Sequence, residues 1–399
     1  MYKSKSYWLT AFPNVYIKCQ NDKSLIYNTQ TGKYLENEDS CIVELMKKLS
    51  DPYNLHCIEC NENTIMNNSL FFRSFIEKGM GSIVHKKDTK KKPIQLFPVL
   101  NLQTDYDFGD LSHKDHILEY LYQLNVYITS KCDNDCKYCD EYSHQYCCCK
   151  KENSTNGYID LSIVRTVARQ IQNCPGITCV NLLGGNPWLH PDLKEIIKIF
   201  ENNKYHVRFW THISLCNKID FKEVNLIFDI MITFPIKIKD NLIKKLITSN
   251  KYLIHFFVTS EQECNEANEI IKTFNIKNFR FHPIFTKENF YFMKNTVFQS
   301  KNEIMYPPVN YRQIFAHQKI NTNFFGMLSL NTNGNISVCA DSPMIASIKN
   351  ANLIDAISKE LSTNTLWRKI RQGKECTDCL YIDLCSSPSL VVFQTVCLG

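Results

Sequence analysis

The sequence predicts an α/β protein built around a partial (β/α)6 barrel, with a small α+β module before it and a cysteine-rich domain after it. Three observations support this prediction. Strand-like and helix-like runs alternate six times between residues 125 and 285, and strands precede helices near the N-terminus. After about 320 this regular alternation gives way to a hairpin, a short helix and a cysteine cluster. We therefore predict domains at 1–90, 91–320 and 321–399.

The N-terminal region has the element order of a winged-helix module. "NVYIKCQ" and "SLIYNTQTGKYLE" alternate like strands, "SCIVELMKKLS" and "NSLFFRSFIEKG" have helical spacing, and "MGSIVH" closes the region as a strand. A polar, proline-bearing stretch around 86–98 predicts a linker to the next domain.

The central region repeats a strand and a helix. The predicted strands are "NVYITS", "CVNLLGG", "HVRFWTHI", "FDIMITFP", "YLIHFFVT" and "FRFHPIF". Repeated βα units give a parallel sheet, and the right-handed crossover rule curls such a sheet into a barrel or partial barrel. Functional side chains are therefore expected at the C-terminal ends of these strands.

Charge and composition narrow the class of protein. The net charge of +6 comes partly from "HKKDTKKKP", which a solvated linker explains better than a nucleic-acid site because no aromatic residues interleave with the lysines. No signal peptide or membrane span is expected, so we predict a cytoplasmic protein without nucleic-acid or membrane partners. In that compartment the 19 cysteines are not a disulfide framework, and metal or iron-sulfur ligation best explains the clustered ones.

One cysteine cluster lies directly after the first barrel strand. "YITSKCDNDCKYCD" places Cys132, Cys136 and Cys139 in a C-x3-C-x2-C spacing, with the aromatic Tyr138 before the last of them. Three thiolates so spaced can hold a cubane cluster while one iron keeps an open position. A glycine pair in "LGGNP" ends the second barrel strand.

These motifs resemble the radical SAM superfamily, whose signature is C-x3-C-x-aromatic-C after the first strand and Gly-Gly-Glu-Pro after the second. The resemblance implies a [4Fe-4S] cluster whose open iron binds S-adenosylmethionine (SAM). An electron from the cluster then releases a 5'-deoxyadenosyl radical, which abstracts a hydrogen atom. The implied cluster ligands are Cys132, Cys136 and Cys139.

The resemblance also implies residues that bind SAM. The main chain around Tyr138 is expected near the adenine, and Gly184 and Gly185 let the backbone approach the methionine end closely. Asn186 replaces the usual glutamate, so its contact with the SAM amino group lacks a charge and should be weaker. The polar strand-end residues Thr211, His212, Thr233 and Thr259, each judged alone, are predicted to be structural. No catalytic side chain is assigned.

A second cysteine cluster lies near the C-terminus. "CTDCLYIDLC" gives C-x2-C-x5-C, and "GNISVC" places a further cysteine, Cys339, after a hairpin. Both resemble elements of the SPASM domain, and a zinc knuckle is the alternative. Ser389 stands where that family has another ligand. The resemblance implies one auxiliary [4Fe-4S] cluster on Cys376, Cys379, Cys385 and Cys397, with Cys339 as the alternative fourth ligand.

The N-terminal pattern resembles the RiPP recognition element, which binds the leader of a ribosomally made precursor peptide as an added strand. An unrelated N-terminal cap is the alternative. Together the three regions are typical of radical SAM peptide maturases, so a precursor peptide and a reductant such as flavodoxin or ferredoxin are the expected partners. Two other functions stay open: a degenerate radical SAM-like partner that presents the peptide, and a sulfatase-maturing type enzyme.

Overall fold

The computed structural model forms two compact units, each made of discontinuous segments. It describes residues 5–99, 117–146, 148–149, 157–172, 174–201, 205–218, 226–236, 240–248, 251–297 and 300–390. Unit 1 contains residues 1–105, 299–322 and 370–387, and unit 2 contains residues 106–298, 323–369 and 388–399. Unit 1 therefore contains segments from both sides of the predicted boundaries near 90 and 320, and unit 2 contains segments from both sides of the boundary near 320.

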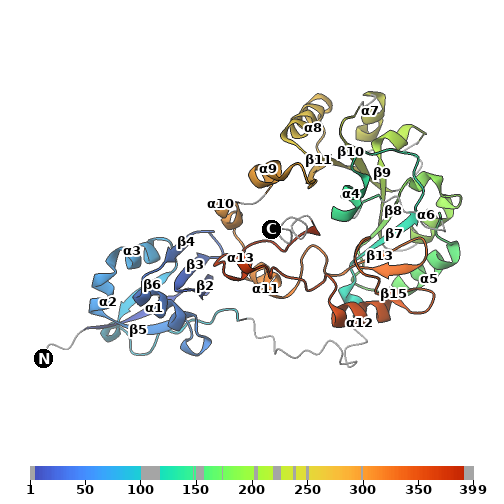
Figure 1. Ribbon diagram of the computed structural model, residues 1–399. Coiled ribbons are helices and arrows are strands. Elements are labelled where there is room, and N and C mark those ends of the chain that lie inside the picture. The colour runs from blue at the N-terminus through green and yellow to red at the C-terminus, as the bar shows by residue number, and fades with distance from the viewer. Residues whose placement is uncertain are drawn as a thin grey trace. The chain divides into compact units, whose positions relative to one another are not determined.

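Unit 1 begins with two three-stranded antiparallel sheets (Figure 1). One sheet has the order β5-β1-β6, with β1 (Ser6–Ala11), β5 (Cys57–Asn61) and β6 (Gly81–His85). The other has the order β2-β3-β4, with β2 (Val15–Gln20), β3 (Lys23–Asn28) and β4 (Tyr34–Asn37). The helices are α1 (Ser40–Ser50), α2 (Glu62–Asn67) and α3 (Ser69–Glu77), with short turns η1 (Pro52–Asn54) and η2 (Lys86–Asp88).

Local sequence explains why α1 forms where it does. The Asp39 carboxylate accepts hydrogen bonds from the backbone N–H groups of Cys41 and Ile42, which satisfies donors that the first turn leaves unpaired. The buried residues Ile42, Val43, Met46 and Leu49 recur at helical spacing and face the core. Three later helices complete unit 1, namely α10 (Lys301–Met305), α11 (Tyr311–Lys319) and α13 (Lys374–Thr377).

Unit 2 is built on a nine-stranded sheet with the order β12-β11-β10-β9-β8-β7-β13-β14-β15. Its six predicted strands are confirmed as neighbours paired in parallel. They are β7 (Gln123–Thr129), β8 (Cys179–Gly184), β9 (His206–His212), β10 (Ile227–Thr233), β11 (Tyr252–Val258) and β12 (Phe279–Pro283). This arrangement confirms the predicted α/β fold with a partial barrel.

The hairpin predicted at the start of the C-terminal domain extends this same sheet. β13 (Met327–Leu330) pairs in parallel with β7, and β14 (Asn335–Ser337) and β15 (Ala346–Ser347) follow it in antiparallel pairing. Asn125 on β7 donates a hydrogen bond to Ser329 on β13 over 3.3 Å, so a buried polar pair helps to set this register. Residues 327–347 therefore belong to the barrel sheet of unit 2.

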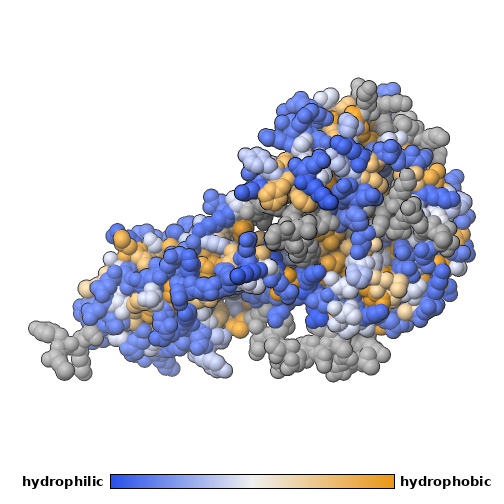
Figure 2. All heavy atoms as spheres, in the orientation of Figure 1, coloured by the Kyte–Doolittle hydropathy of each residue, from blue (hydrophilic) through white to orange (hydrophobic). Residues whose placement is uncertain are grey.

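Helices cover the sheet of unit 2, and their apolar faces supply its core. They are α4 (Cys139–Gln145), α5 (Leu161–Ile171), α6 (Leu193–Glu201), α7 (Asp240–Thr248), α8 (Glu261–Phe274), α9 (Phe290–Phe292) and α12 (Leu353–Thr363), with turns η4 (Pro187–Leu189), η5 (Ile213–Lys218) and η6 (Met293–Val297). α5 buries five apolar residues, whereas α8 buries only Ala267 fully and shows a mostly hydrophilic surface in Figure 2. Within the described residues, no helix is long and apolar enough to cross a membrane.

Candidate functional site

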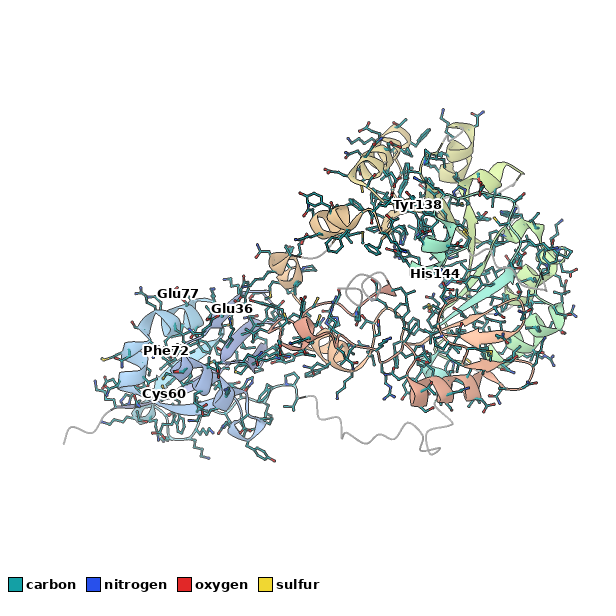
Figure 3. The ribbon with its side chains drawn as sticks, in the orientation of Figure 1. Glu36, Cys60, Phe72, Glu77, Tyr138 and His144 are labelled. Atoms are coloured by element: carbon teal, nitrogen blue, oxygen red, sulfur yellow. The ribbon has the colours of Figure 1, made fainter. Side chains whose placement is uncertain are left out.

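The first cysteine cluster lies in the loop between β7 and α4, at the C-terminal end of the first barrel strand. Tyr138 and His144 stand at the two ends of α4 (Figure 3). The Asn134 side chain donates a hydrogen bond to the Cys136 sulfur over 3.0 Å, and the Asn134 backbone N–H donates to the Cys132 sulfur over 3.4 Å. Hydrogen bonds to sulfur stabilise a thiolate, which is the form that ligates metal.

The chemistry of these side chains fits an iron-sulfur cluster. Burial, with a smaller contribution from the neighbouring thiols of Cys149, Cys139 and Cys132, raises the pKa of Cys136 to about 12. The thiols therefore lie close enough together to interact, and a bound metal would remove the cost of ionising them. Among the described residues, no three His, Cys, Asp or Glu side chains stand together as a ready-made metal site. Cluster binding therefore requires the loop to draw its three sulfurs together.

The glycine pair at the end of β8 packs against the end of β7 and the start of this loop. Gly184 has φ +141°, and a Cβ placed on it would lie 2.4 Å from the Thr129 carbonyl oxygen. A Cβ on Gly185 would lie 2.4 Å from the Lys131 carbonyl oxygen and 2.9 Å from Cβ of Cys132. Both positions require glycine because the backbone at the end of β7 and at the start of the cysteine loop occupies the space of a side chain.

Asn186 is buried and uses both ends of its amide within the protein. Its Nδ2 donates a hydrogen bond of 2.7 Å to Oδ1 of Asp133, and its Oδ1 accepts one of 3.2 Å from the backbone N–H of Trp188. The carboxylate of Asp133 is thereby held at the Gly-Gly-Asn turn. The sequence reasoning missed Asp133, and its only sequence signal is its position between the first two cysteines.

Two of the strand-end residues connect to the cysteine loop through a chain of hydrogen bonds. The Ser214 hydroxyl donates to Oδ1 of Asn134 over 3.1 Å and lies 2.7 Å from Nδ1 of His212. Nε2 of His212 lies 3.0 Å from the Thr233 hydroxyl, and burial lowers the pKa of His212 to about 4. The imidazole is therefore neutral near pH 7.

The other two strand-end residues have structural partners. Thr211 accepts a 2.9 Å hydrogen bond from the Trp188 indole, and Thr259 donates to the Glu263 carboxylate at the first turn of α8. Neither side chain contacts a residue of the cysteine loop in the hydrogen bonds that the described residues form.

A second polar chain crosses four strands inside the barrel. Arg208 on β9 donates from Nε and Nη2 to the fully buried carboxylate of Asp229 on β10, over 2.7 and 2.5 Å. His255 on β11 lies 2.7 Å from Oδ1 of Asp229 through Nε2, and its Nδ1 lies 2.8 Å from Nε2 of His282 on β12. The sequence reasoning missed this chain, whose members come from four separate strands.

The hydrogen bonds fix the tautomers of both histidines. A carboxylate only accepts, so Nε2 of His255 carries hydrogen and its Nδ1 accepts from Nε2–H of His282. Nδ1 of His282 is then a lone-pair acceptor. Burial lowers the pKa of His255, and it lowers the pKa of His282 to about 3, so both rings are neutral near pH 7.

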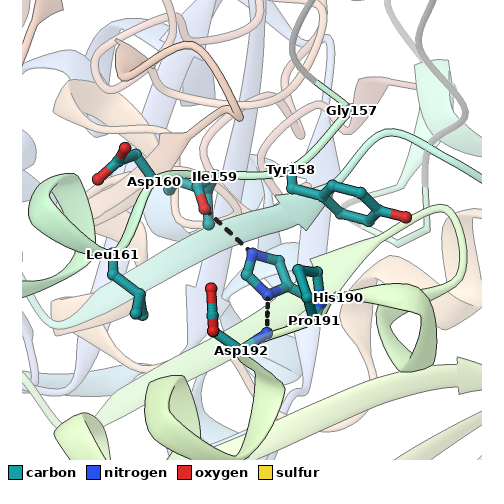
Figure 4. A pocket seen from close by; sticks show the side chains of 8 residues that line it. All are labelled: Gly157, Tyr158, Ile159, Asp160, Leu161, His190, Pro191 and Asp192. Atoms are coloured by element: carbon teal, nitrogen blue, oxygen red, sulfur yellow. Dashed lines mark hydrogen bonds between the residues drawn. The ribbon is translucent and has the colours of Figure 1, made fainter.

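A cavity of about 630 Å³ lies between the segment that leads into α5 and the turn that precedes α6 (Figure 4). It is lined by Gly157, Tyr158, Ile159, Asp160, Leu161, His190, Pro191 and Asp192. Nδ1 of His190 accepts from the Asp192 backbone N–H over 3.0 Å, and Nε2 donates to the Ile159 carbonyl over 3.0 Å. Both ring nitrogens are therefore occupied, and none of the predicted site residues lines this cavity.

The second cysteine cluster belongs to unit 1. Burial raises the pKa of Cys385, and the thiols of Cys376 and Cys379 add to this increase, so the three thiols lie near enough to interact, although they do not stand together as a ready-made metal site. Cys397 lies outside the described residues. Cys339 belongs to unit 2, is buried directly after β14, and hydrogen-bonds with Ser342.

Comparisons with known proteins find one family model and several solved structures that are similar to this chain. Residues 126–260 match the family model described as the Radical SAM superfamily. Similar solved structures include Streptococcus suis SuiB bound to precursor peptide SuiA, with 13% identity over 98% of this chain and 100% of that chain and a TM-score of 0.42. They also include anSMEcpe with bound AdoMet, with 12% identity over 69% of this chain and 95% of that chain and a TM-score of 0.49. No curated protein matches.

The family match covers β7 to β11, and it includes both the cysteine loop and the Gly-Gly-Asn turn. It agrees with the parallel order of these strands and with the position of the loop at the end of β7. Residues 126–260 of this chain therefore form a radical SAM domain.

Proposed function

We propose that this chain is a radical SAM enzyme that modifies a ribosomally made precursor peptide. One observation carries the enzymatic part: the cysteine loop lies at the end of β7 and packs against Gly185 within a radical SAM domain. The proposed cluster ligands are Cys132, Cys136 and Cys139. When a [4Fe-4S] cluster and SAM are bound there, they supply a 5'-deoxyadenosyl radical that abstracts a hydrogen atom.

The residues around the loop have proposed roles in binding. Asn134 stabilises the Cys136 thiolate by donating to its sulfur. The main chain around Tyr138 and the two glycines contact SAM. The Asp133 carboxylate, held by Asn186, places a negative charge at the turn where the superfamily has a glutamate, and it attracts the SAM ammonium group.

The proposed peptide-binding element is the sheet β2-β3-β4 of unit 1. β4 is an edge strand, and edge strands can accept an additional strand from a peptide. Lys78, at the end of α3, donates a 2.8 Å hydrogen bond to the Tyr34 carbonyl on β4. The helix and the edge strand therefore lie together as the two sides that a docked peptide would contact; Figure 3 labels Glu36 on β4 and Phe72 on α3.

We also propose one auxiliary [4Fe-4S] cluster on Cys376, Cys379 and Cys385, with Cys397 as fourth ligand and Cys339 as its alternative. A flavodoxin or ferredoxin is the proposed reductant. An anaerobic experiment tests the enzyme: the protein is reconstituted with iron and sulfide, reduced, and mixed with SAM. Release of 5'-deoxyadenosine that is lost in Cys136→Ala supports it, and intact SAM with a fully loaded loop cluster contradicts it.

A second candidate function is a non-catalytic partner that binds and presents the peptide. The observation that favours it is Asn186, whose amide is already engaged by Asp133 and Trp188. This candidate predicts peptide binding without SAM cleavage. Measuring 5'-deoxyadenosine release and peptide binding on the same reconstituted protein separates the two functions, because only the enzyme releases the nucleoside.

A further inference from the structure

The sheet β2-β3-β4 is covered on both faces, and the two covers come from distant parts of the sequence. Val15 and Ile17 on β2 and Ile26 on β3 belong to the core shared with α1 and α3. Leu25 and Tyr27, the alternate residues of β3, belong to a different cluster that includes Leu380 and Leu384. Successive residues of a strand face opposite sides, so the segment carrying the second cysteine cluster packs on the second face.

Polar contacts follow the same alternation along β2. The Tyr16 hydroxyl donates to Oδ2 of Asp383 over 2.6 Å, and Nζ of Lys18 donates to the same oxygen over 2.5 Å. The Gln20 amide donates to the Thr377 carbonyl. Three successive residues on one face of β2 therefore bind the segment 377–383, and α13 lies beside this strand in Figure 1.

The edge strand β4 makes the third set of contacts. The Glu36 carboxylate accepts a hydrogen bond from the Tyr381 hydroxyl and forms an ion pair with Lys301. Tyr381 lies between Cys379 and Cys385 in the sequence. The cysteine segment therefore contacts all three strands, including the edge strand that is proposed to accept the peptide.

The cysteine segment has little structure of its own to keep these contacts in place. Its only regular element among the described residues is the four-residue α13. The backbone N–H of Cys379 donates to the Cys376 carbonyl over 3.1 Å and that of Cys385 donates to the Tyr381 carbonyl over 2.9 Å, so single turns join the cysteines. Short segments of this kind commonly depend on a metal centre for a defined shape.

We propose that a thiolate-bound metal centre on Cys376, Cys379 and Cys385 is a structural clamp on the sheet β2-β3-β4. The metal fixes the turns that present Tyr381 and Asp383, and these two residues hold β4 and β2. The clamp deepens the proposed function, because it rests on this sheet being the peptide-binding element. It gives the cysteine segment a role in recognition that is separate from electron transfer.

Hydrogen exchange on the whole protein tests the clamp. The anaerobically reconstituted protein is compared with the same protein after chelation, and iron, sulfide and zinc are counted to identify the metal. We expect amides of β2 and β4 to exchange about tenfold faster without metal. For a second comparison the loop cysteines are replaced in both the metal-bound and the metal-free sample. In that comparison the exchange of amides in β8 and β9 should remain unchanged. Equal exchange in β2 and β4 with metal bound to the three cysteines would overturn the clamp, as would absence of metal there.

Variants that leave the cysteines intact test whether the contacts with the sheet in turn help the cysteines to retain the metal. Asp383→Asn and Tyr381→Phe remove contacts with β2 and β4, so reciprocity predicts faster loss of metal to a chelator. Asp378→Asn is the matched control, because it changes a carboxylate in the same segment, and no ion pair of Asp378 occurs among the described residues. Unchanged metal retention in both contact variants would contradict the clamp. None of these measurements requires SAM cleavage, so failure of the proposed enzymatic function would be visible separately.

Discussion

The buried Asp229 chain leads to a prediction whose size follows from its geometry. Asp229→Asn keeps the shape of the side chain but removes the charge that faces Arg208 and His255. Breaking a buried ion pair typically costs ~3–5 kcal/mol because one charge stays uncompensated. Since 27% of the Arg208 side chain remains exposed, water compensates part of its charge. We therefore expect unit 2 to lose about 3 kcal/mol of unfolding free energy.

The same variant should reverse the hydrogen-bond direction of the chain. If the oxygen of the introduced amide keeps the Arg208 donors, the NH2 group of that amide faces His255, whose Nε2 must then accept. Nδ1–H of His255 would next donate to Nε2 of His282, and the hydrogen of His282 would move to Nδ1. Nitrogen-15 NMR of histidine-labelled protein distinguishes these tautomers directly.

Urea unfolding monitored by tryptophan fluorescence measures the loss of stability, because three of the four tryptophans belong to unit 2. Glu195→Gln is the matched control: its ion pair with Arg165 spans 3.4 Å and both side chains are about half exposed, so a loss below about 0.5 kcal/mol is expected. A loss below about 1 kcal/mol in Asp229→Asn, or unchanged histidine tautomers, would refute the reasoning.

Three further predictions concern pH, the glycine turn and the second cysteine cluster. The folded pKa values of His212 and His282, about 4 and about 3, lie below the usual value near 6.5, so the unfolded chain binds protons first on acidification. Their contribution to the free energy of unfolding is therefore complete above pH ~6.5, and the contribution of each histidine should fall by about 2 kcal/mol between pH 7 and 5. Urea unfolding at both pH values measures this fall, with His212→Gln as the control. Gly184→Ala places Cβ 2.4 Å from a carbonyl oxygen, so unit 2 should lose at least ~2 kcal/mol and loop iron should fall; full iron retention would contradict this. Cys376→Ala should remove about half of the iron and leave the Cys132 cluster visible by electron paramagnetic resonance, and loss of all iron would contradict the proposed division of ligands.

Local patterns were sufficient to predict the barrel strands and the first cysteine loop. A period of two residues in the strands and of 3.6 in the helices depends only on neighbouring residues, and the six strands from β7 to β12 follow these periods. The C-x3-C-x2-C motif is equally local, because one loop carries all three thiols. Cys149, in contrast, is buried in the same apolar cluster as Cys136, and the C-x3-C-x2-C spacing does not indicate this contact.

The remaining features depend on contacts between residues far apart in the chain. Asp133 and Asn186 are separated by 53 positions, and Lys18 and Asp383 by 365, so no local pattern relates them. Arg208, Asp229 and His255 look like ordinary strand residues until parallel pairing brings β9, β10 and β11 together. Residue types and their spacing were therefore enough to indicate which elements form, and they are the basis for proposing which side chains bind a cluster. Which charges meet, and that the second cysteine segment covers the N-terminal sheet, became visible only in the folded chain, because packing and long-range hydrogen bonds select those partners.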